Sequence, residues 1–143
     1  MHFPDDVRRV LSRAGWSPNR RVDVASWEAV VAAEEWEFVK PARGFLTRFG
    51  GLDILWPGPD GSARELVLGI TPELEDPARY EEATGVRLTP VGLGFSGHYT
   101  FFIGADGAMY GAFDGDLGRW GADATEGLTV VLRNERPNPI TGF

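Results

Sequence analysis

Apolar residues recur at helical spacing along the first third of the chain. In residues 4–13, Val7, Val10 and Leu11 share one helical face, and two aspartates in the first turn complement the helix dipole. The same spacing predicts two further helices, which carry Trp27, Val30 and Val31 in one case and Pro41, Phe45, Leu46 and Phe49 in the other. The two glycines Gly50 and Gly51 then end the helical part.

Alternation of apolar and polar residues follows, and it predicts strands. The strongest signal is a hairpin, because two runs rich in strand-forming residues flank Asp106 and Gly107, which tolerate the positive φ of a tight turn. The expected strands cover residues 52–56, 65–70, 86–91, 99–103, 108–113 and 117–120. A polar, helix-compatible stretch covers residues 72–84, and a last amphipathic helix is expected over residues 122–133.

Helices first, strands in the middle and a closing helix predict an α+β fold. We expect a central, mainly antiparallel sheet packed by the N-terminal helices and by the C-terminal helix. The chain has 143 residues, which suits one domain over 1–143. Its core is expected over 3–133, and residues 134–143 are expected to form a loose tail.

Composition narrows the classes of function. Acidic residues number 21 against 14 basic ones, so the net charge is −7, and the chain has two histidines and no cysteine. Disulfides, thiolate chemistry and a multi-histidine zinc site are therefore excluded. The acidic balance argues against binding nucleic acid or an anionic membrane. No stretch approaches the ~18 apolar residues of a membrane span, and the first residues lack the pattern of a signal peptide, so we expect a cytoplasmic location.

Two short motifs resemble ligand sites but fail on their context. Residues 92–97 match G-x-G-x-x-G, yet residues 98–103 predict a strand where the dinucleotide fingerprint needs a helix. We expect a glycine turn that enters the hairpin. Residues 114–116 open like a calcium loop, but the later positions that should supply oxygen ligands hold glycine and threonine. We expect a turn between strands there.

The sequence gives little support for a catalytic group. Glu34 with Glu35, and Glu81 with Glu82, are adjacent in sequence and would not face each other on a helix, so both pairs are expected to solvate a surface. His98 has no evident serine or aspartate partner. We expect no catalytic residue, no bound metal and no cofactor.

Several blocks of sequence resemble the SUKH superfamily, in particular its third group of immunity proteins. The blocks are Phe3-Pro4-x-x-Val7, Ala14-Gly15-Trp16-x-Pro18-x-Arg20-x-Val22-Asp23-x-x-x-Trp27, Ala42-x-x-Phe45-Leu46-x-x-Phe49-Gly50-Gly51-Leu52, Tyr80-x-x-x-x-Gly85-x-x-Leu88-x-Pro90-Val91-Gly92 and Asp106-Gly107-x-Met109-Tyr110. The resemblance runs from about Phe3 to Leu132 and implies the α+β fold given above. It also implies a bacterial immunity protein that binds and neutralises a cognate polymorphic toxin domain, often a nuclease or deaminase. It brings no catalytic residues.

Three hypotheses follow. The first is an immunity protein that blocks its toxin by occlusion, as a monomer or weak dimer. The second is an adaptor or regulatory module of the same fold that binds a cellular partner. The third is a small enzyme that uses carboxylates or His98, in which case His98→Ala should abolish an activity of the purified protein.

The acidic residues are unevenly distributed, which bears on where a partner binds. They gather in the middle and the C-terminal third, whereas the first 21 residues are rich in arginine. An acidic surface attracts a basic partner, and tight interfaces centre on a few buried anchors, often aromatic. The candidate partner-binding residues are Glu73, Glu75, Asp76, Asp114, Asp116 and Trp120.

Overall fold

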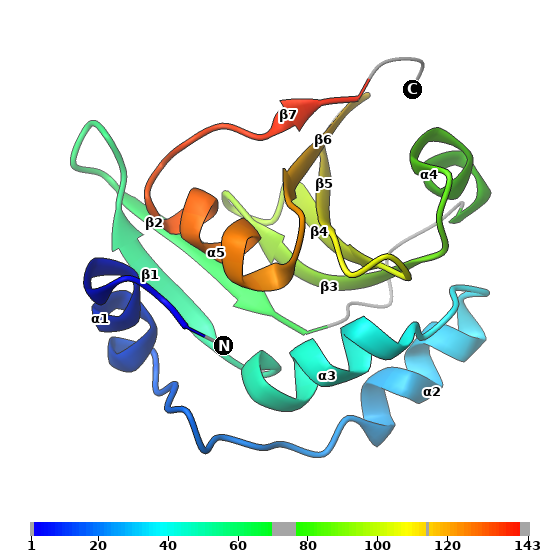
Figure 1. Ribbon diagram of the computed structural model, residues 1–143, viewed down its shortest axis with the longest axis horizontal. Helices are drawn as coiled ribbons and strands as arrows, with labels where there is room; N and C mark the ends of the chain where they lie inside the picture. The colour runs from blue at the N-terminus through cyan, green and yellow to red at the C-terminus, as the bar shows by residue number, and fades with distance from the viewer. Residues whose placement is uncertain (1, 70–76, 114, 141–143) are drawn as a thin grey trace.

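The computed structural model describes residues 2–69, 77–113 and 115–140. Its helices and strands follow the order expected from the sequence, with three helices first and a sheet after them (Figure 1). The helices are α1 Asp5–Arg13, α2 Ala25–Ala33, α3 Lys40–Phe49, α4 Pro77–Thr84 and α5 Ala124–Leu132. The strands are β1 Asp53–Pro57, β2 Ala63–Leu68, β3 Leu88–Gly94, β4 Tyr99–Gly104, β5 Met109–Phe113, β6 Asp116–Gly121 and β7 Asn138–Pro139.

The seven strands form one antiparallel sheet in which each strand pairs with the next along the chain. This arrangement confirms the predicted α+β fold with helices before and after the sheet. The expected hairpin around Asp106 and Gly107 is present, and Gly107 has a φ of 85°. Asp123 caps α5, since its side chain accepts a hydrogen bond from the backbone N–H of Glu126 at 2.8 Å.

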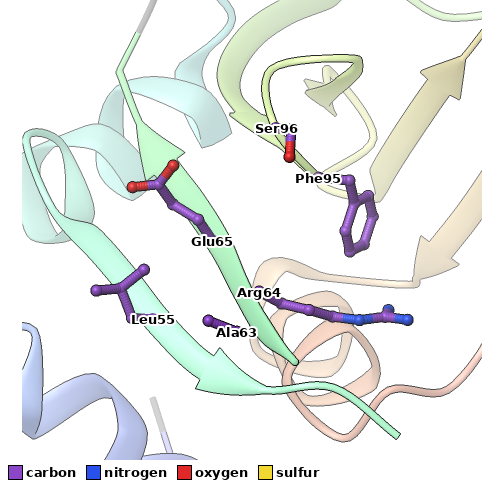
Figure 2. Close-up of a pocket in the computed structure, with 6 residues that line it drawn as sticks. All are labelled: Leu55, Ala63, Arg64, Glu65, Phe95 and Ser96. Carbon is purple, nitrogen blue, oxygen red and sulfur yellow. The ribbon is translucent and has the colours of Figure 1, made fainter. Parts of the chain in front are cut away.

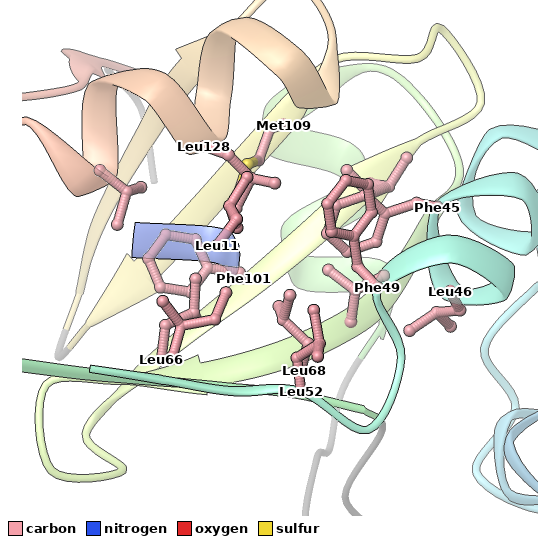
Figure 3. Close-up of a cluster of buried hydrophobic side chains, with 14 of the residues drawn as sticks. Leu11, Phe45, Leu46, Phe49, Leu52, Leu66, Leu68, Phe101, Met109 and Leu128 are labelled. Atoms are coloured by element: carbon pink, nitrogen blue, oxygen red, sulfur yellow. The ribbon is translucent and has the colours of Figure 1, made fainter. Parts of the chain in front are cut away.

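The inner face of the curled sheet holds the main core. Side chains from α1, α3 and α5 converge there on those of the strands, as Figure 3 shows. Leu11, Phe49, Phe101 and Leu128 are each fully buried in it. Helix α5 comes so close to β5 that a Cβ at position 127 would lie 2.7 Å from the Cβ of Met109, so this position requires glycine.

The outer face of the sheet has a second, smaller core. Phe102 lies at its centre, with its ring 5.4 Å from that of Trp36 and 5.2 Å from that of Tyr80. Trp36 comes from the segment after α2, and Tyr80 comes from α4. The cover over this part of the sheet is therefore supplied by two segments that are distant in sequence.

Strand β3 differs from its prediction because it runs on to Gly94 with an irregularity between Pro90 and Gly92. Gly92 faces the neighbouring strand closely, since a Cβ there would lie 2.7 Å from the carbonyl oxygen of Val67. The first two glycines of the G-x-G-x-x-G run thus belong to a strand, and the chain then turns into β4. The expected glycine turn is therefore confirmed only from residue 95 onward, where residues 95–98 form the turn and the strand β4 follows it.

The loose tail predicted from residue 134 is wrong for its first part. Asn138 and Pro139 pair with β6, and the backbone N–H of Ile140 donates to the carbonyl of Leu117 at 2.9 Å. Ile140 packs against the outer core, and this apolar contact holds the tail on the sheet. Pro139 is tolerated in β7 because β7 is an edge strand. The part of the predicted 72–84 helix before Pro77 lies outside the described residues.

Candidate partner-binding surface

The β1–β2 hairpin carries apolar side chains on both of its faces. Its inward residues, Ile54 and Leu66, are fully buried. On the outer face, where alternation calls for polar residues, Leu55 is 57% exposed and Val67 is 43% exposed. Together with Phe113, these are the large apolar side chains that stand exposed in the described part of the chain. A large apolar side chain left in water on a regular strand suggests a contact surface.

Two carboxylates share this outer face with the apolar side chains. Asp53 pairs with Val67, and Leu55 pairs with Glu65, so Asp53 and Glu65 are diagonal neighbours across the two strands. Leu93 of β3 pairs with the other side of Val67 and extends the apolar row. We call the surface formed by Asp53, Leu55, Glu65, Val67 and Leu93 the bare half of the outer face. The part under Trp36 and Tyr80 is the covered half.

The two carboxylates of the bare half, Asp53 and Glu65, lie close to each other. The pKa of Glu65 is raised, first because its carboxyl can share a hydrogen bond with Asp53 when protonated, and second because the two ionised carboxylates repel each other. The ion pairs within the described ranges involve other carboxylates, such as Asp6 with Arg133 and Glu81 with Arg87. The bare half therefore has unneutralised negative charge beside exposed apolar surface.

A groove of about 600 Å³ opens beside the bare half, between the start of β2 and the turn that joins β3 to β4. Figure 2 shows Leu55 and Glu65 on one side of the hairpin, whereas Arg64 extends on the other side toward the ring of Phe95. The Arg64 guanidinium carbon lies 5.4 Å from the centre of that ring, so this cation stacks on an aromatic face. Phe95 and Ser96 have positive φ values of 52° and 65°, which fixes the turn in a conformation rare for residues other than glycine.

The candidate residues taken from the sequence lie elsewhere. Glu73, Glu75, Asp76 and Asp114 fall outside the described residues. Asp116 is exposed at the start of β6. Trp120 is only 6% exposed, and its indole N–H donates to the hydroxyl of Tyr99 at 2.9 Å, so its side chain presents little surface to a partner. Burial raises the pKa of Tyr99 to about 12, which keeps this hydroxyl protonated.

The rejected catalytic groups also have places in the structure. His98 is exposed in the β3–β4 turn, with its ring 6.2 Å from that of Phe113. Glu81 is not a solvated surface residue as expected, because its side chain is only 14% exposed and accepts a hydrogen bond from the backbone N–H of Leu88 at 2.9 Å. It fastens α4 to β3. Across the described ranges, no group of three or more histidine, aspartate or glutamate side chains is placed to hold a metal ion.

The sequence did contain a signal for the bare half. Ile54-Leu55-Trp56 and Leu66-Val67-Leu68 are unbroken apolar triplets in strands that otherwise alternate between apolar and polar residues next to them, as at Asp53 and Glu65. The middle residue of each triplet must point away from the inner core. The carboxylates of this face form no cluster in the sequence. Asp53 and Glu65 are 12 residues apart and meet only through the pairing of β1 with β2.

Comparison with protein families gives one finding. A family model described as SUKH-3 immunity protein matches residues 3–134. Comparisons with curated proteins and with solved structures give no match. In the part of the chain that the structure describes, no helix is long and apolar enough to cross a membrane.

Proposed function

The chain belongs to the SUKH-3 immunity protein family, and from this premise we propose that it neutralises a cognate toxin domain by occlusion. The family match over residues 3–134 is the observation that carries the proposal. It supports an immunity role and binding to a toxin protein. The chemistry of the toxin, the mode of neutralisation and the contact residues are the proposal's own additions.

The toxin domain is proposed to be a nuclease or deaminase that acts on nucleic acid. Such a domain needs a cationic surface for phosphates, and an inhibitor with a net charge of −7 complements that surface. The immunity protein would cover this surface without performing chemistry, in the cytoplasm, as a monomer or weak dimer. The carboxylates Glu73, Glu75, Asp76, Asp114 and Asp116 are proposed to steer the encounter, and the small exposed part of Trp120 is proposed to join the contact.

Co-expression tests the proposal directly. The toxin domain encoded beside this gene is expressed in a sensitive host with and without the protein, and growth and co-purification are measured. The proposal expects restored growth and a stable complex. Full toxicity in the presence of folded, abundant protein would refute it and would favour the adaptor hypothesis.

Charge steering gives a second, kinetic test. If acidic residues attract the toxin at a distance, raising the salt concentration should slow association more than it speeds dissociation, because screening acts on the separated partners. Surface plasmon resonance at several ionic strengths separates the two rates. A salt effect confined to dissociation would argue against steering.

A further inference from the structure

We propose that the bare half of the outer sheet face is the docking surface for the toxin domain. In this assignment an arginine or lysine of the partner lies between Asp53 and Glu65, and apolar partner side chains cover Leu55 and Val67. The inference deepens the proposed function, on which it rests, because it names the contact surface and the chemistry that it recognises.

The exposed apolar side chains of this face support the assignment. Leu55 and Val67 stand on adjacent strands with their side chains 57% and 43% exposed, and Leu93 continues the row on the third strand. On the same sheet, the covered half shows what happens to apolar outward residues that serve folding, since Phe102 is 1% exposed beneath Trp36 and Tyr80. Leu55 and Val67 gain little from folding, and burial by a partner would remove their apolar surface from water.

Charge complementarity also supports the assignment. Asp53 lies close enough to Glu65 to raise the pKa of Glu65, and neither carboxylate forms an ion pair with a cation within the described ranges. The nearest arginine in sequence, Arg64, points to the other side of the hairpin and stacks on Phe95. A partner cation placed between the two carboxylates would relieve their repulsion, and a guanidinium can donate to both.

The shape of the surface also supports the assignment. The groove beside Glu65 is lined by Leu55, Ala63 and Ser96, and on its other side by Arg64 stacked on Phe95, and its volume of about 600 Å³ leaves room for a protruding long side chain. One of its walls is the β3–β4 turn, which is held in an uncommon backbone conformation. A partner side chain thus meets acidic and apolar groups in a fixed arrangement, which lowers the entropy cost of docking.

A second copy of this chain is a poorer occupant. A two-fold symmetric contact through this face would set the Asp53 and Glu65 pair of one protomer against the same pair of the other. Four carboxylates would then gather with no cation that the face itself supplies. Charge therefore favours a cationic partner over a homodimer.

The experiment measures binding to the toxin domain encoded beside this gene. The apolar variants Leu55→Thr and Val67→Thr place a β-branched, strand-compatible side chain at each position, and the charge variants Asp53→Asn and Glu65→Gln keep side-chain size. Phe113→Thr and Glu135→Gln are the matched controls, since Phe113 is 44% exposed and Glu135 is an exposed carboxylate outside the bare half. Circular dichroism and thermal melting confirm that each variant is folded.

Each paired variant, Leu55→Thr with Val67→Thr or Asp53→Asn with Glu65→Gln, should weaken affinity at least about tenfold, mainly through faster dissociation. The two controls should stay within about twofold of the wild type. Glu65→Lys should bind weakest, and a matching Arg→Glu or Lys→Glu change on the toxin should restore binding to it. Such rescue identifies a direct charge pair, because a merely structural defect would persist.

The outcomes separate the two proposals. If the wild-type protein binds but the bare-half variants bind as tightly, or the controls lose as much, the docking surface is wrong and the immunity function stands. A change of oligomeric state in the Leu55 or Val67 variants of the free protein would assign the face to a second copy and overturn the inference. If the wild-type protein does not bind the toxin domain at all, the proposed function fails and the inference fails with it.

Discussion

The two halves of the outer sheet face use apolar side chains in opposite ways. In the covered half, Phe102 and Tyr110 are buried beneath Trp36 and Tyr80. In the bare half, Leu55 and Val67 occupy equivalent outward positions and remain exposed. Both halves belong to one antiparallel sheet with the same alternation of side chains.

One sheet face can thus be divided between a part that stabilises the fold and a part that is available to a partner. Apolar surface that a protein's own helices cover contributes to folding, whereas apolar surface left in water is available to a partner. Charge follows the same division. In the covered half Asp106 accepts a hydrogen bond from the Tyr110 hydroxyl at 2.7 Å, whereas in the bare half Asp53 and Glu65 crowd each other.

The largest effect is expected at the centre of the covered half. Phe102→Ala should lower the free energy of unfolding by about 3–5 kcal/mol, because it opens a cavity beneath two aromatic rings. Urea denaturation followed by tryptophan fluorescence measures this change in the free energy of unfolding. A loss below about 1 kcal/mol would mean that the covered half contributes little to stability. The two halves would then not differ in their contribution to folding.

The attachment of the covering segment should matter next. Thr89 is fully buried, and its hydroxyl accepts from the backbone N–H of Val39 at 2.9 Å and donates to the carbonyl of Glu37. Thr89→Val keeps the shape but leaves both backbone groups unpaired, so we expect a loss of about 1–3 kcal/mol. Thr89→Ser, which keeps the hydroxyl, is the control, and equal losses in the two variants would show that the hydrogen bonds are not the cause.

Substitutions in the bare half should change the free energy of unfolding very little. Leu55→Thr should change the free energy of unfolding by less than about 0.5 kcal/mol, because the side chain is already exposed and threonine suits a strand. The same denaturation experiment applies. A large loss would show that Leu55 serves folding, and it would remove the main reason to regard this half as a contact surface.

The smallest effect is a pH-dependent gain. The folded-state pKa of Glu65 is raised by Asp53, so ionisation of Glu65 opposes folding once the pH exceeds its ordinary value. Glu65→Gln should therefore raise the melting temperature slightly at pH 7, and the gain should fade as the pH drops below the ordinary range of a glutamate. A loss at pH 7, or a gain independent of pH, would contradict repulsion between the two carboxylates.

Local signals in the sequence were enough for most of the fold. The aspartate–glycine turn at residues 106–107 and the helical spacing before Gly50 depend on nearby residues, and both predictions are confirmed. The tail was mispredicted because pairing of Asn138 with β6 depends on a distant strand. Strand β3 was predicted over residues 86–91 and not Leu88–Gly94, because the close approach of β2 at Gly92 also depends on a distant segment.

The candidate surface was harder to find than the fold. Charge clusters along the sequence pointed to the middle and C-terminal segments, whereas the proposed contact residues come from three strands and share a face only through their register. Trp120 illustrates the converse error, since an aromatic residue that suits an interface is buried in the core against Tyr99. The composition of a segment does not tell which of its side chains reach solvent.

The most direct test of the docking surface is hydroxyl-radical footprinting of the complex with the toxin domain. Side-chain oxidation is measured by mass spectrometry for the free protein and for the complex. We expect the toxin domain to protect Leu55 and Val67, while oxidation of Phe113, which is about as exposed as Val67, is unchanged. Unchanged oxidation of Leu55 and Val67 in a fully formed complex would contradict it.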